Sequence, residues 1–413
     1  MIAALLLLGW GWASIDRCGH WEAAPPVLHA LGRAAGPLRV GAAVVDIAPK
    51  YPVPVAGYFP PRATATTAAL PIAARATVVE VGGQPVALVL VDTLLVTRAM
   101  RERLQAEAGL PVWLVATHTH SSLGGLDRRL AAQLGGLGAY DPAQEAAVVD
   151  AAKAALVQAK ARLAPALLEL STGDSLHLSA PRKGGLVDTA LTRVRFLGPS
   201  GPLAQWVVLS AHPALVPPGA AALDPDWPGR LSRSEEAGGP VTLVLQGGSG
   251  NASVDRATAT TPEAFALAVR ARLEKLTPSP PQETTELAWA EVVLGLARPD
   301  ASRLAPAPFR AAAQNVLCDD AERDVTLAGL RLGPVTILFT PVEPSAEAAQ
   351  VLAEQAQAGR VVSLANGYAG YVEPEPVARA GEGESDKQYF DPGFLSRLAD
   401  AARLAGQAIA PAR

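Results

Sequence analysis

The chain has 413 residues, of which 49% are hydrophobic and 18% charged, and its formal net charge at pH 7 is −4. A chain of this length and apolar content can bury a sizeable core, which is typical of a soluble α/β globule. The small negative charge, without a basic stripe or a block of like charges, excludes a nucleic-acid partner recognised through its phosphates.

The N-terminal residues Ile2 to Ala13 form an apolar run that is short for a membrane span and typical of a signal-peptide core. We therefore predict that residues 1–37 are a leader plus a linker, and that the protein is exported or anchored by this segment. No Lys or Arg precedes the run, so an apolar segment packed on the domain stays open as the alternative. No later segment has the pattern of a transmembrane helix.

The two cysteines, Cys18 and Cys318, are far apart and belong to no close-spaced ligand pattern. The residues before Cys18 lack the small residue that a lipid-attachment site requires. A disulfide in an exported chain and a buried free thiol at Cys318 are both compatible with the sequence.

From Leu38 onward, short β-rich runs alternate with amphipathic helical runs. We predict a single α/β domain over residues 38–413, with a mixed, multi-stranded sheet flanked by helices. The expected strands, rich in Val and Leu, are Arg39–Val45, Ala76–Val81, Val86–Val91, Val112–Ala116, Leu167–Ser171, Thr192–Phe196, Gln205–Leu209, Val241–Leu245, Leu287–Val293, Val325–Leu332 and Val335–Phe339. The expected helices are Thr97–Ala108, Pro142–Arg162, Pro262–Lys275, Ser345–Ala358 and Phe394–Gly406.

Several of these strands end in polar residues that can carry chemistry: Asp92, His118, His212, and the pair Ser249 and Ser253. In open α/β sheets the ligand crevice lies beyond the carboxyl ends of the strands. The recurrence therefore predicts one site built from segments far apart in the sequence, with a metal at the carboxyl ends of the strands.

The stretch His118-Thr119-His120 follows the apolar run Val112–Ala116, in a chain with only six histidines. On an extended backbone, side chains two residues apart point to the same face. Both imidazoles would then reach one centre, which is the pattern of a metal site. The plainer interpretation of His118 or of His212 alone is a hydrogen-bonded histidine at a strand end.

Taken in order, a set of short motifs resembles the neutral ceramidase family. The motifs are Ala116–Gly125, Ala211-His212-Pro213, Gly250–Ser253, Pro341–Pro344 and Asn366–Tyr371, preceded by Gly41–Pro49, Gly57-Tyr58 and Ala74–Ala76. The resemblance covers roughly Leu38 to Phe390 and implies that family's catalytic-domain fold. The chain ends soon after the last expected helix, so we expect no C-terminal immunoglobulin-like domain.

The resemblance implies one zinc ion held by His118, His212, Glu343 and Tyr371. Two neutral imidazoles and one carboxylate leave positive charge on the metal, which can acidify a bound water and polarise a carbonyl. Glu343 also precedes the expected Ser345–Ala358 helix, where a carboxylate favours the helix dipole, and both roles can hold at once.

By the same resemblance, His120 serves the oxyanion and the leaving group, with direct metal binding as the alternative. Arg182 and Tyr389 fall near the family's oxyanion-side residues, although an exposed loop cation is an equally good interpretation of Arg182. Ser253 is either a nucleophile or a group that orients the substrate, and we favour metal-activated water with Ser253 in the orienting role. A Gly-rich turn also carries Ser by default.

The resemblance implies a zinc-dependent amidohydrolase that cleaves an N-acyl bond, with a ceramide-like lipid as the leading substrate and contact with a membrane surface. A zinc esterase or amidase on another acyl substrate is an alternative. Two departures from the family pattern, Asn251 and Leu123, motivate a third hypothesis, a non-catalytic lipid-binding relative. The Gly- and Glu-rich segment Ala380–Glu384 is interpreted as a disordered surface insertion, with a lid as the alternative.

Overall fold

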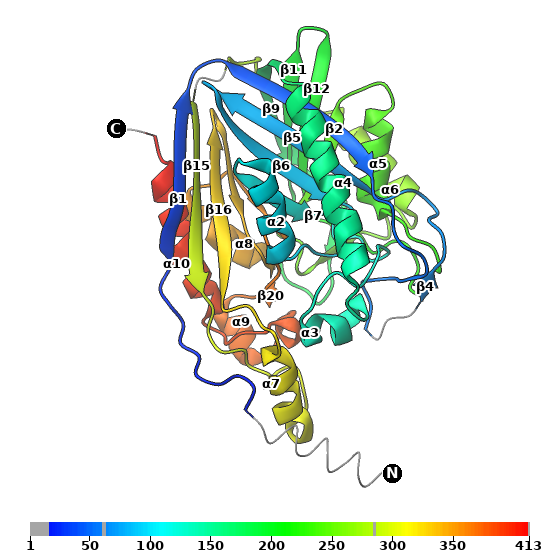
Figure 1. The fold of residues 1–413 in the computed structure, drawn as a ribbon, viewed down its shortest axis with the longest axis vertical. Helices are drawn as coiled ribbons and strands as arrows, with labels where there is room; N and C mark the ends of the chain where they lie inside the picture. Colours follow the sequence, from blue (N-terminus) through cyan, green and yellow to red (C-terminus); the bar gives the residue numbers. More distant parts are fainter. Residues whose placement is uncertain (1–15, 60–62, 284–285, 412–413) are drawn as a thin grey trace.

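The computed structural model describes residues 16–59, 63–283 and 286–411. The apolar run Ile2 to Ala13 lies outside these residues. The predicted single mixed α/β domain is confirmed, with three main sheets in the described part of the chain instead of one, and helices on their outer faces (Figure 1).

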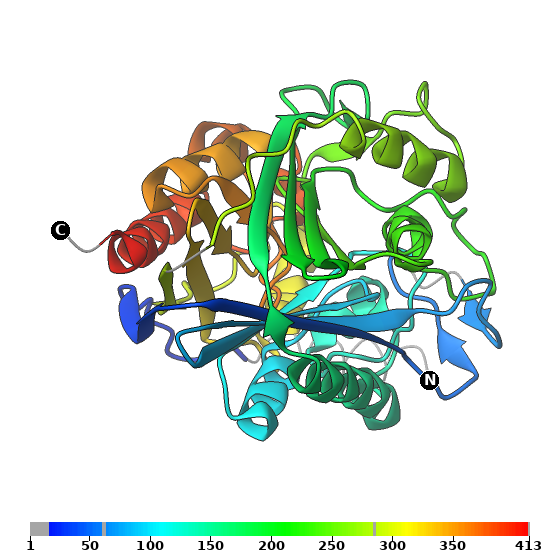
Figure 2. The ribbon, with the colours of Figure 1, turned by 90° about the horizontal axis from the view of Figure 1, so that it is seen from above.

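The first sheet has the order β7-β6-β5-β2-β8. Its strands are β2 (Leu38–Asp46), β5 (Ala73–Val81), β6 (Gln84–Val91), β7 (Val112–Ala116) and β8 (Ala164–Pro165). Both faces are apolar: Val89 packs under the helices, whereas Leu88 and Leu90 face the other sheets. The covering helices are α2 (Arg98–Ala108) and α4 (Pro142–Ala161). Figure 2 shows both helices on the outer side of this sheet.

The second sheet has the order β13-β12-β11-β9. Its strands are β9 (Leu167–Asp174), β11 (Ala190–Gly198), β12 (Gly201–Leu209) and β13 (Val241–Gln246). Helices α5 (Asp226–Glu236) and α6 (Pro262–Leu273) pack beside it. Strands β12 and β13 run parallel, so the segments that follow them leave the sheet at the same edge.

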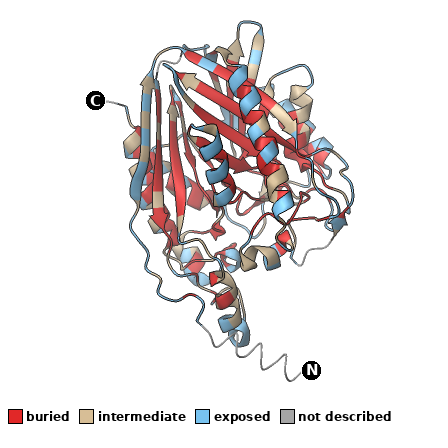
Figure 3. Cartoon of the chain, viewed as in Figure 1, coloured by how far each residue is buried: buried red, intermediate tan, exposed pale blue. Residues whose placement is uncertain are grey.

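The third sheet has the order β1-β15-β16-β17-β19. Its strands are β1 (Val27–Ala35), β15 (Glu286–Gly295), β16 (Asp324–Leu332), β17 (Val335–Phe339) and β19 (Arg360–Val362). Helices α8 (Ala346–Ala356) and α10 (Phe394–Ile409) cover one face. The three sheets share one central core, in which the rings of Trp113 and Phe339 stack with centroids 5.3 Å apart. Figure 3 shows the central strands buried and the outer helix faces exposed.

The predicted strands and long helices are all present, with ends shifted by a few residues. Helix α2 is capped by Thr97, α6 by Thr261 and α8 by Ser345, whose side chains each accept a backbone N–H of the first turn. Among the longer elements, β1, α5 and α7 (Arg310–Cys318) were not predicted, and neither were the short strands and helical turns. Strand β1 lies within residues 1–37, which the sequence analysis assigns to leader plus linker, and it pairs with β15.

The smaller elements are short. They are β3 (Val53–Pro54), β4 (Thr64–Ala65), α3 (Leu130–Ala132), η1 (Gln133–Leu137), β10 (Ser179–Pro181), β14 (Ala252–Val254), η2 (Ala307–Phe309), β18 (Glu343–Pro344), β20 (Tyr371–Val372), α9 (Glu375–Ala380) and η3 (Ser385–Lys387).

Cys18 and Cys318 form a disulfide, which answers the question that the sequence left open. None of the helices in the described ranges is both long and apolar enough to cross a lipid bilayer.

Candidate metal centre

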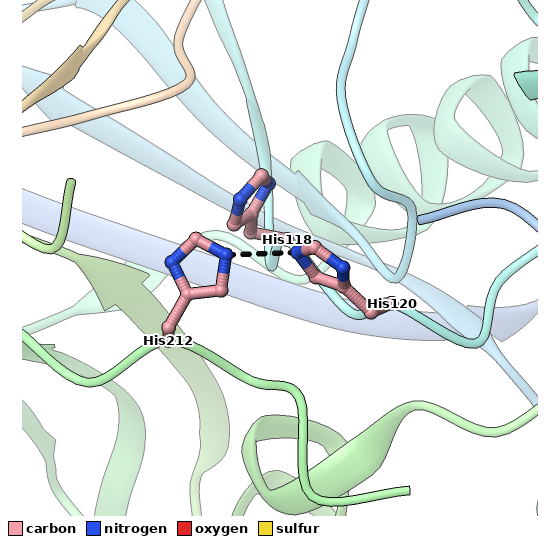
Figure 4. Close-up of side chains that lie close together, drawn as sticks. All are labelled: His118, His120 and His212. Carbon is pink, nitrogen blue, oxygen red and sulfur yellow. Dashed lines mark hydrogen bonds between the residues drawn. The ribbon is translucent and has the colours of Figure 1, made fainter. Parts of the chain in front are cut away.

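Three histidines from two sheets converge on one point (Figure 4). His118 and His120 follow β7 of the first sheet, and His212 follows β12 of the second. The ring centroids of His118 and His212 are 4.5 Å apart, and one ring nitrogen from each of the three lies within 4.8 Å of the others. The Nε2 atoms of His120 and His212 are 2.8 Å apart. The predicted convergence of distant strand ends on one site is therefore present.

The backbone that brings His118 there is not extended, as the sequence analysis assumed. Strand β7 ends at Ala116, and His118 has φ of 69°, in the left-handed region that non-glycine residues rarely adopt. Its backbone N–H donates to the carbonyl of Thr93 at 2.9 Å. The turn sets the rings of His118 and His120 nearly perpendicular, at 85°, with centroids 5.0 Å apart. The expected geometry was wrong, while both rings still reach the same centre.

Backbone carbonyls orient two of the imidazoles. Nδ1 of His118 lies 2.7 Å from the carbonyl oxygen of Leu94, and Nδ1 of His212 lies 3.4 Å from that of Ser249. Donation from Nδ1 to a carbonyl leaves the lone pair on Nε2, the arrangement seen in metal-binding histidines. Both Nε2 atoms are thus prepared as acceptors or ligands.

Glu343 and Tyr371 are paired residues of the short parallel ladder between β18 and β20. Glu343 is buried, and its Oε1 accepts a hydrogen bond from the hydroxyl of Tyr368 at 2.6 Å. Its Oε2 lies 2.9 Å from Nε2 of His118, yet neither of these buried atoms has a hydrogen-bond partner. The ladder therefore delivers a carboxylate and a phenol to the histidines.

Burial and the charges of neighbouring groups together set the pKa values of this centre. Burial, reinforced by repulsion from His118, lowers the pKa of His120 to about 3 and that of His212 well below its usual value. Burial also acts to raise the pKa of Glu343, but attraction to His118 and hydrogen bonds outweigh it and hold that pKa at about 2. His120 and His212 are therefore neutral and Glu343 is ionised at neutral pH.

The remaining predicted residues lie around the same centre. Arg182 follows β10, its guanidinium carbon is 5.9 Å from the centre of the Tyr371 ring, and it also donates to the carbonyl of Gly250. Ser253 lies on β14, and its backbone forms an isolated parallel β-bridge with the backbone of His212. Tyr389 packs its ring edge-on to Tyr368, with centroids 6.3 Å apart. Arg182 is thus held in place, and the interpretation of an exposed loop cation is wrong.

All eight predicted site residues line one cavity of about 670 Å³. This volume is within the range of roughly 300–1,000 Å³ that is typical of small-molecule sites. They are His118, His120, Arg182, His212, Ser253, Glu343, Tyr371 and Tyr389. The rest of its wall is mostly apolar, with Arg129, Glu322, Asp386 and Lys387 as the charged members.

The segment Ala380–Glu384 is not the disordered surface insertion that the sequence analysis favoured. It contains the end of α9 and a turn that buries the side chain of Glu384. The Glu384 carboxylate lies 3.0 Å from Nε of Arg182 and 2.5 Å from Nζ of Lys387. The turn therefore fixes a cation that lines the cavity.

The two departures from the family pattern do not alter the cavity lining. Asn251 is buried, accepts the N–H of Ala346 at 3.0 Å and donates to the carbonyl of Leu186 at 2.8 Å. Leu123 packs in the core under the first sheet. Asp92 and Ser249 also lie outside the lining, and Asp92 instead pairs with Arg75 at 2.9 Å.

Sequence reasoning missed several cavity residues. Tyr368 orients Glu343, and it lies inside the motif Asn366–Tyr371 that was singled out. Arg129 and Glu322 both line the cavity and form an ion pair, with 3.8 Å between Nη1 and Oε2. No local signal marks this second pair, because the two residues come from separate loops.

The residues fit a metal ion. The test is Nε2 of His118 and Oε2 of Glu343, two buried atoms that face each other at 2.9 Å without a hydrogen bond to any group, beside the ring of His212. Nitrogen and carboxylate ligands of this kind are those that zinc prefers in catalytic sites. His120 is close enough to be an additional ligand, so the geometry keeps that alternative open.

Of the comparisons with known proteins, the one with solved structures identifies a similar fold. No protein-family model matches the sequence, and no curated protein sequence matches it at a significant level. A crystal structure of neutral ceramidase from Pseudomonas aeruginosa is similar with a TM-score of 0.74 at 20% identity, over 90% of this chain and 75% of that one. A structure of ceramidase complexed with C2 gives the same TM-score and coverage at 18% identity. The chain therefore has a ceramidase-like fold.

Proposed function

We propose that the protein is a zinc-dependent hydrolase of N-acyl amides, with a ceramide-like lipid as the leading substrate. The observation that carries this proposal is the buried Nε2 of His118 facing Oε2 of Glu343 at 2.9 Å without a hydrogen bond, beside His212, in a largely apolar cavity. The ceramidase-like fold supports the same class of reaction.

His118, His212, Glu343 and Tyr371 would hold the metal. Zinc bound by such ligands supplies an acidified water and polarises a carbonyl oxygen. Tyr368 holds one oxygen of Glu343, and the carbonyl of Leu94 fixes the ring of His118. These contacts keep the donor atoms in place without metal, so little reorganisation accompanies binding.

Three other side chains act on the substrate in this proposal. The guanidinium of Arg182 provides positive charge for the oxyanion that develops on the acyl carbonyl. His120, which burial keeps neutral, would take a proton from the water that attacks the acyl carbonyl and give it to the leaving amine. Ser253, bridged to His212, orients the substrate through its hydroxyl, and Tyr389 lines the same cavity.

We also propose that the protein acts outside the cytoplasm, against a lipid surface. The Cys18–Cys318 disulfide supports export, because such bonds persist in oxidising compartments. An ester or another amide is the alternative substrate on the same machinery. The non-catalytic alternative is less well supported, since neither Asn251 nor Leu123 lines the cavity.

Zinc content tests the proposal first. We expect about one zinc ion per chain, by elemental mass spectrometry, in purified wild-type protein after reconstitution, and a large loss in Glu343→Gln. His118→Ala should lose metal and amide hydrolysis together. Ser253→Ala is the matched control, because it should keep zinc while turnover falls. A His118→Ala protein with full zinc and full activity would refute the ligand set.

The substrate class needs a separate assay. N-acyl sphingoid bases, simple N-acyl amines and the corresponding esters should be compared as substrates of the zinc-loaded protein. Preferential hydrolysis of the amides supports the proposal, and preferential hydrolysis of the esters supports the alternative. Zinc-free protein that binds lipid, together with zinc-loaded protein that turns over none of these substrates, would favour a binding function.

A further inference from the structure

A long excursion leaves the third sheet between β15 and β16. Gly295 and Asp324 are still paired in the ladder, and the N–H of Leu296 donates to the carbonyl of Arg323 at 2.8 Å. Residues 296–323, which we call the β15–β16 insert, therefore depart from the sheet and return to the same place. The insert contains η2 and α7, which project from one end of the molecule (Figure 1).

The insert makes one apolar wall of the cavity. Its side chains that line the cavity are Leu296, Pro299, Leu304, Leu317, Ala321 and Glu322. The other apolar wall contains Leu94, Leu95, Ala131, Ala132 and Leu137. The two walls are linked by the Arg129–Glu322 ion pair, and α3 packs against α7. A hydrocarbon chain that entered the cavity would lie against these surfaces.

The N-terminal segment from Cys18 to Trp21 is bonded to the insert at several points. The disulfide joins Cys18 to Cys318, the last residue of α7. Nε1 of Trp21 donates to the carbonyl of Leu296 at 2.8 Å. The guanidinium of Arg323 lies 3.7 Å from the centre of the Trp21 ring and donates to the carbonyl of Cys18 at 3.2 Å. The insert is thus fixed covalently near the end of α7 as well as at its base.

We infer that the β15–β16 insert, held by the Cys18–Cys318 disulfide, is the wall that selects the length of the substrate's acyl chain. This inference rests on the proposed function. A wall tethered at two places keeps its shape, so each methylene group of a long chain meets a fixed apolar surface. An acyl chain too short to reach Leu317 gains nothing from the insert.

Bulk added to the wall tests this inference with the disulfide intact. Leu317→Trp should lower kcat/KM for a hexadecanoyl amide and leave a butanoyl amide nearly unchanged. Each methylene that loses its apolar contact should cost about fourfold in kcat/KM, so a total loss of more than about tenfold is expected. Ala311→Trp is the matched control, because Ala311 is an exposed residue of α7 outside the cavity lining.

The tether is tested with the double variant Cys18→Ser/Cys318→Ser. We expect the ratio of hexadecanoyl to butanoyl kcat/KM to fall by about tenfold, while butanoyl hydrolysis persists. An unchanged ratio in a folded double variant would overturn the role of the disulfide. If this variant does not fold, the comparison of Leu317→Trp with Ala311→Trp decides the inference alone.

Binding separates this inference from the proposed function. Calorimetry measures the affinity of the cavity for hexadecanoic acid, which depends on the insert and requires no hydrolysis. If wild type hydrolyses no amide but Leu317→Trp binds the acid more weakly than Ala311→Trp does, the hydrolase proposal fails, while the insert keeps its role as a wall that contacts an acyl chain. If amide hydrolysis is intact and both Trp variants show the wild-type chain-length profile, the inference is overturned and the function stands.

Discussion

At the scale of single residues, the centre depends on imidazoles that burial keeps neutral. The pKa of His120 is lowered to about 3, first by burial and then by repulsion from His118. A neutral ring costs less to bury than an imidazolium and keeps a lone pair for a proton or a metal. The same burial makes the folded state sensitive to acid.

We expect the free energy of unfolding of the metal-free protein to fall on acidification below pH 6.5. Between the usual pKa of 6.5 and the folded value of about 3, the unfolded chain binds a proton at His120 that the folded chain does not. The contribution of His120 to stability is therefore complete above pH 6.5 and is lost as the pH falls. His120→Gln should reduce the slope by up to about 1.4 kcal/mol per pH unit.

Urea unfolding in the presence of a chelator, at pH values from 7.5 down to 5, checks this expectation. His177→Gln, at a histidine outside the cavity lining, is the control and should keep the wild-type slope. Equal slopes in wild type and His120→Gln would show that burial does not hold His120 neutral. Glu343 adds to acid sensitivity only at lower pH, because its pKa is held at about 2, below its usual 4.5.

At the scale of elements, the loop after β3 positions the histidine turn. The N–H of Ala56 donates to the carbonyl of Ser122 at 2.9 Å, which holds the two loops together. Gly57 has φ of 119°, and a Cβ there would lie 2.6 Å from Cα of His120 and 2.7 Å from its Cβ. Only glycine allows this approach.

Gly57→Ala should therefore displace His120 and lower amide hydrolysis by at least about tenfold, since small misplacements of catalytic groups are costly. Zinc content should stay near that of wild type, because the three atoms nearest the added Cβ all belong to His120 and none to a proposed ligand. Gly219→Ala is the control: φ there is 90°, with no atom within 4 Å of the added Cβ. Equal activity in the two variants would contradict the positioning role.

At the scale of the whole molecule, a buried ion cluster joins two of the three sheets. Arg75 of β5 is fully buried and lies 2.9 Å from Asp92 at the end of β6 and 2.8 Å from Glu236 at the end of α5. Glu236 also accepts the N–H of Thr242 in β13. The cluster links the first sheet to the helix and strand of the second, whose edges carry the histidines.

Arg75→Leu should destabilise the protein by about 3–5 kcal/mol, because it leaves the Asp92 carboxylate buried without its cation. Arg39→Leu is the control, since Arg39 of the neighbouring strand β2 makes a partly exposed pair with Glu80 at 2.9 Å. That pair should contribute at most about 1 kcal/mol. Denaturant unfolding measures the loss of free energy of unfolding in each variant. Equal losses would show that the buried cluster stabilises the protein no more than the exposed pair does.

The sequence by itself determined the elements whose signals are local. Apolar runs such as Val112–Ala116 and cap residues such as Thr261 gave the strands and long helices, because periodicity and capping act over a few residues. The ordered motifs also indicated the eight side chains that the structure brings to one cavity. The elements it missed carry weak or conflicting signals, as in α5, where Asp226-Trp227-Pro228-Gly229 contains two helix breakers.

Only the tertiary structure decided how these parts meet. The division into three sheets, the left-handed turn at His118, the burial of Glu384 against Arg182 and the burial of Asn251 against Ala346 all depend on contacts between distant segments. The disulfide that ties residue 18 to residue 318 has the same origin. Such contacts are set by the packing of complete layers around a shared core, and no window of sequence contains that information.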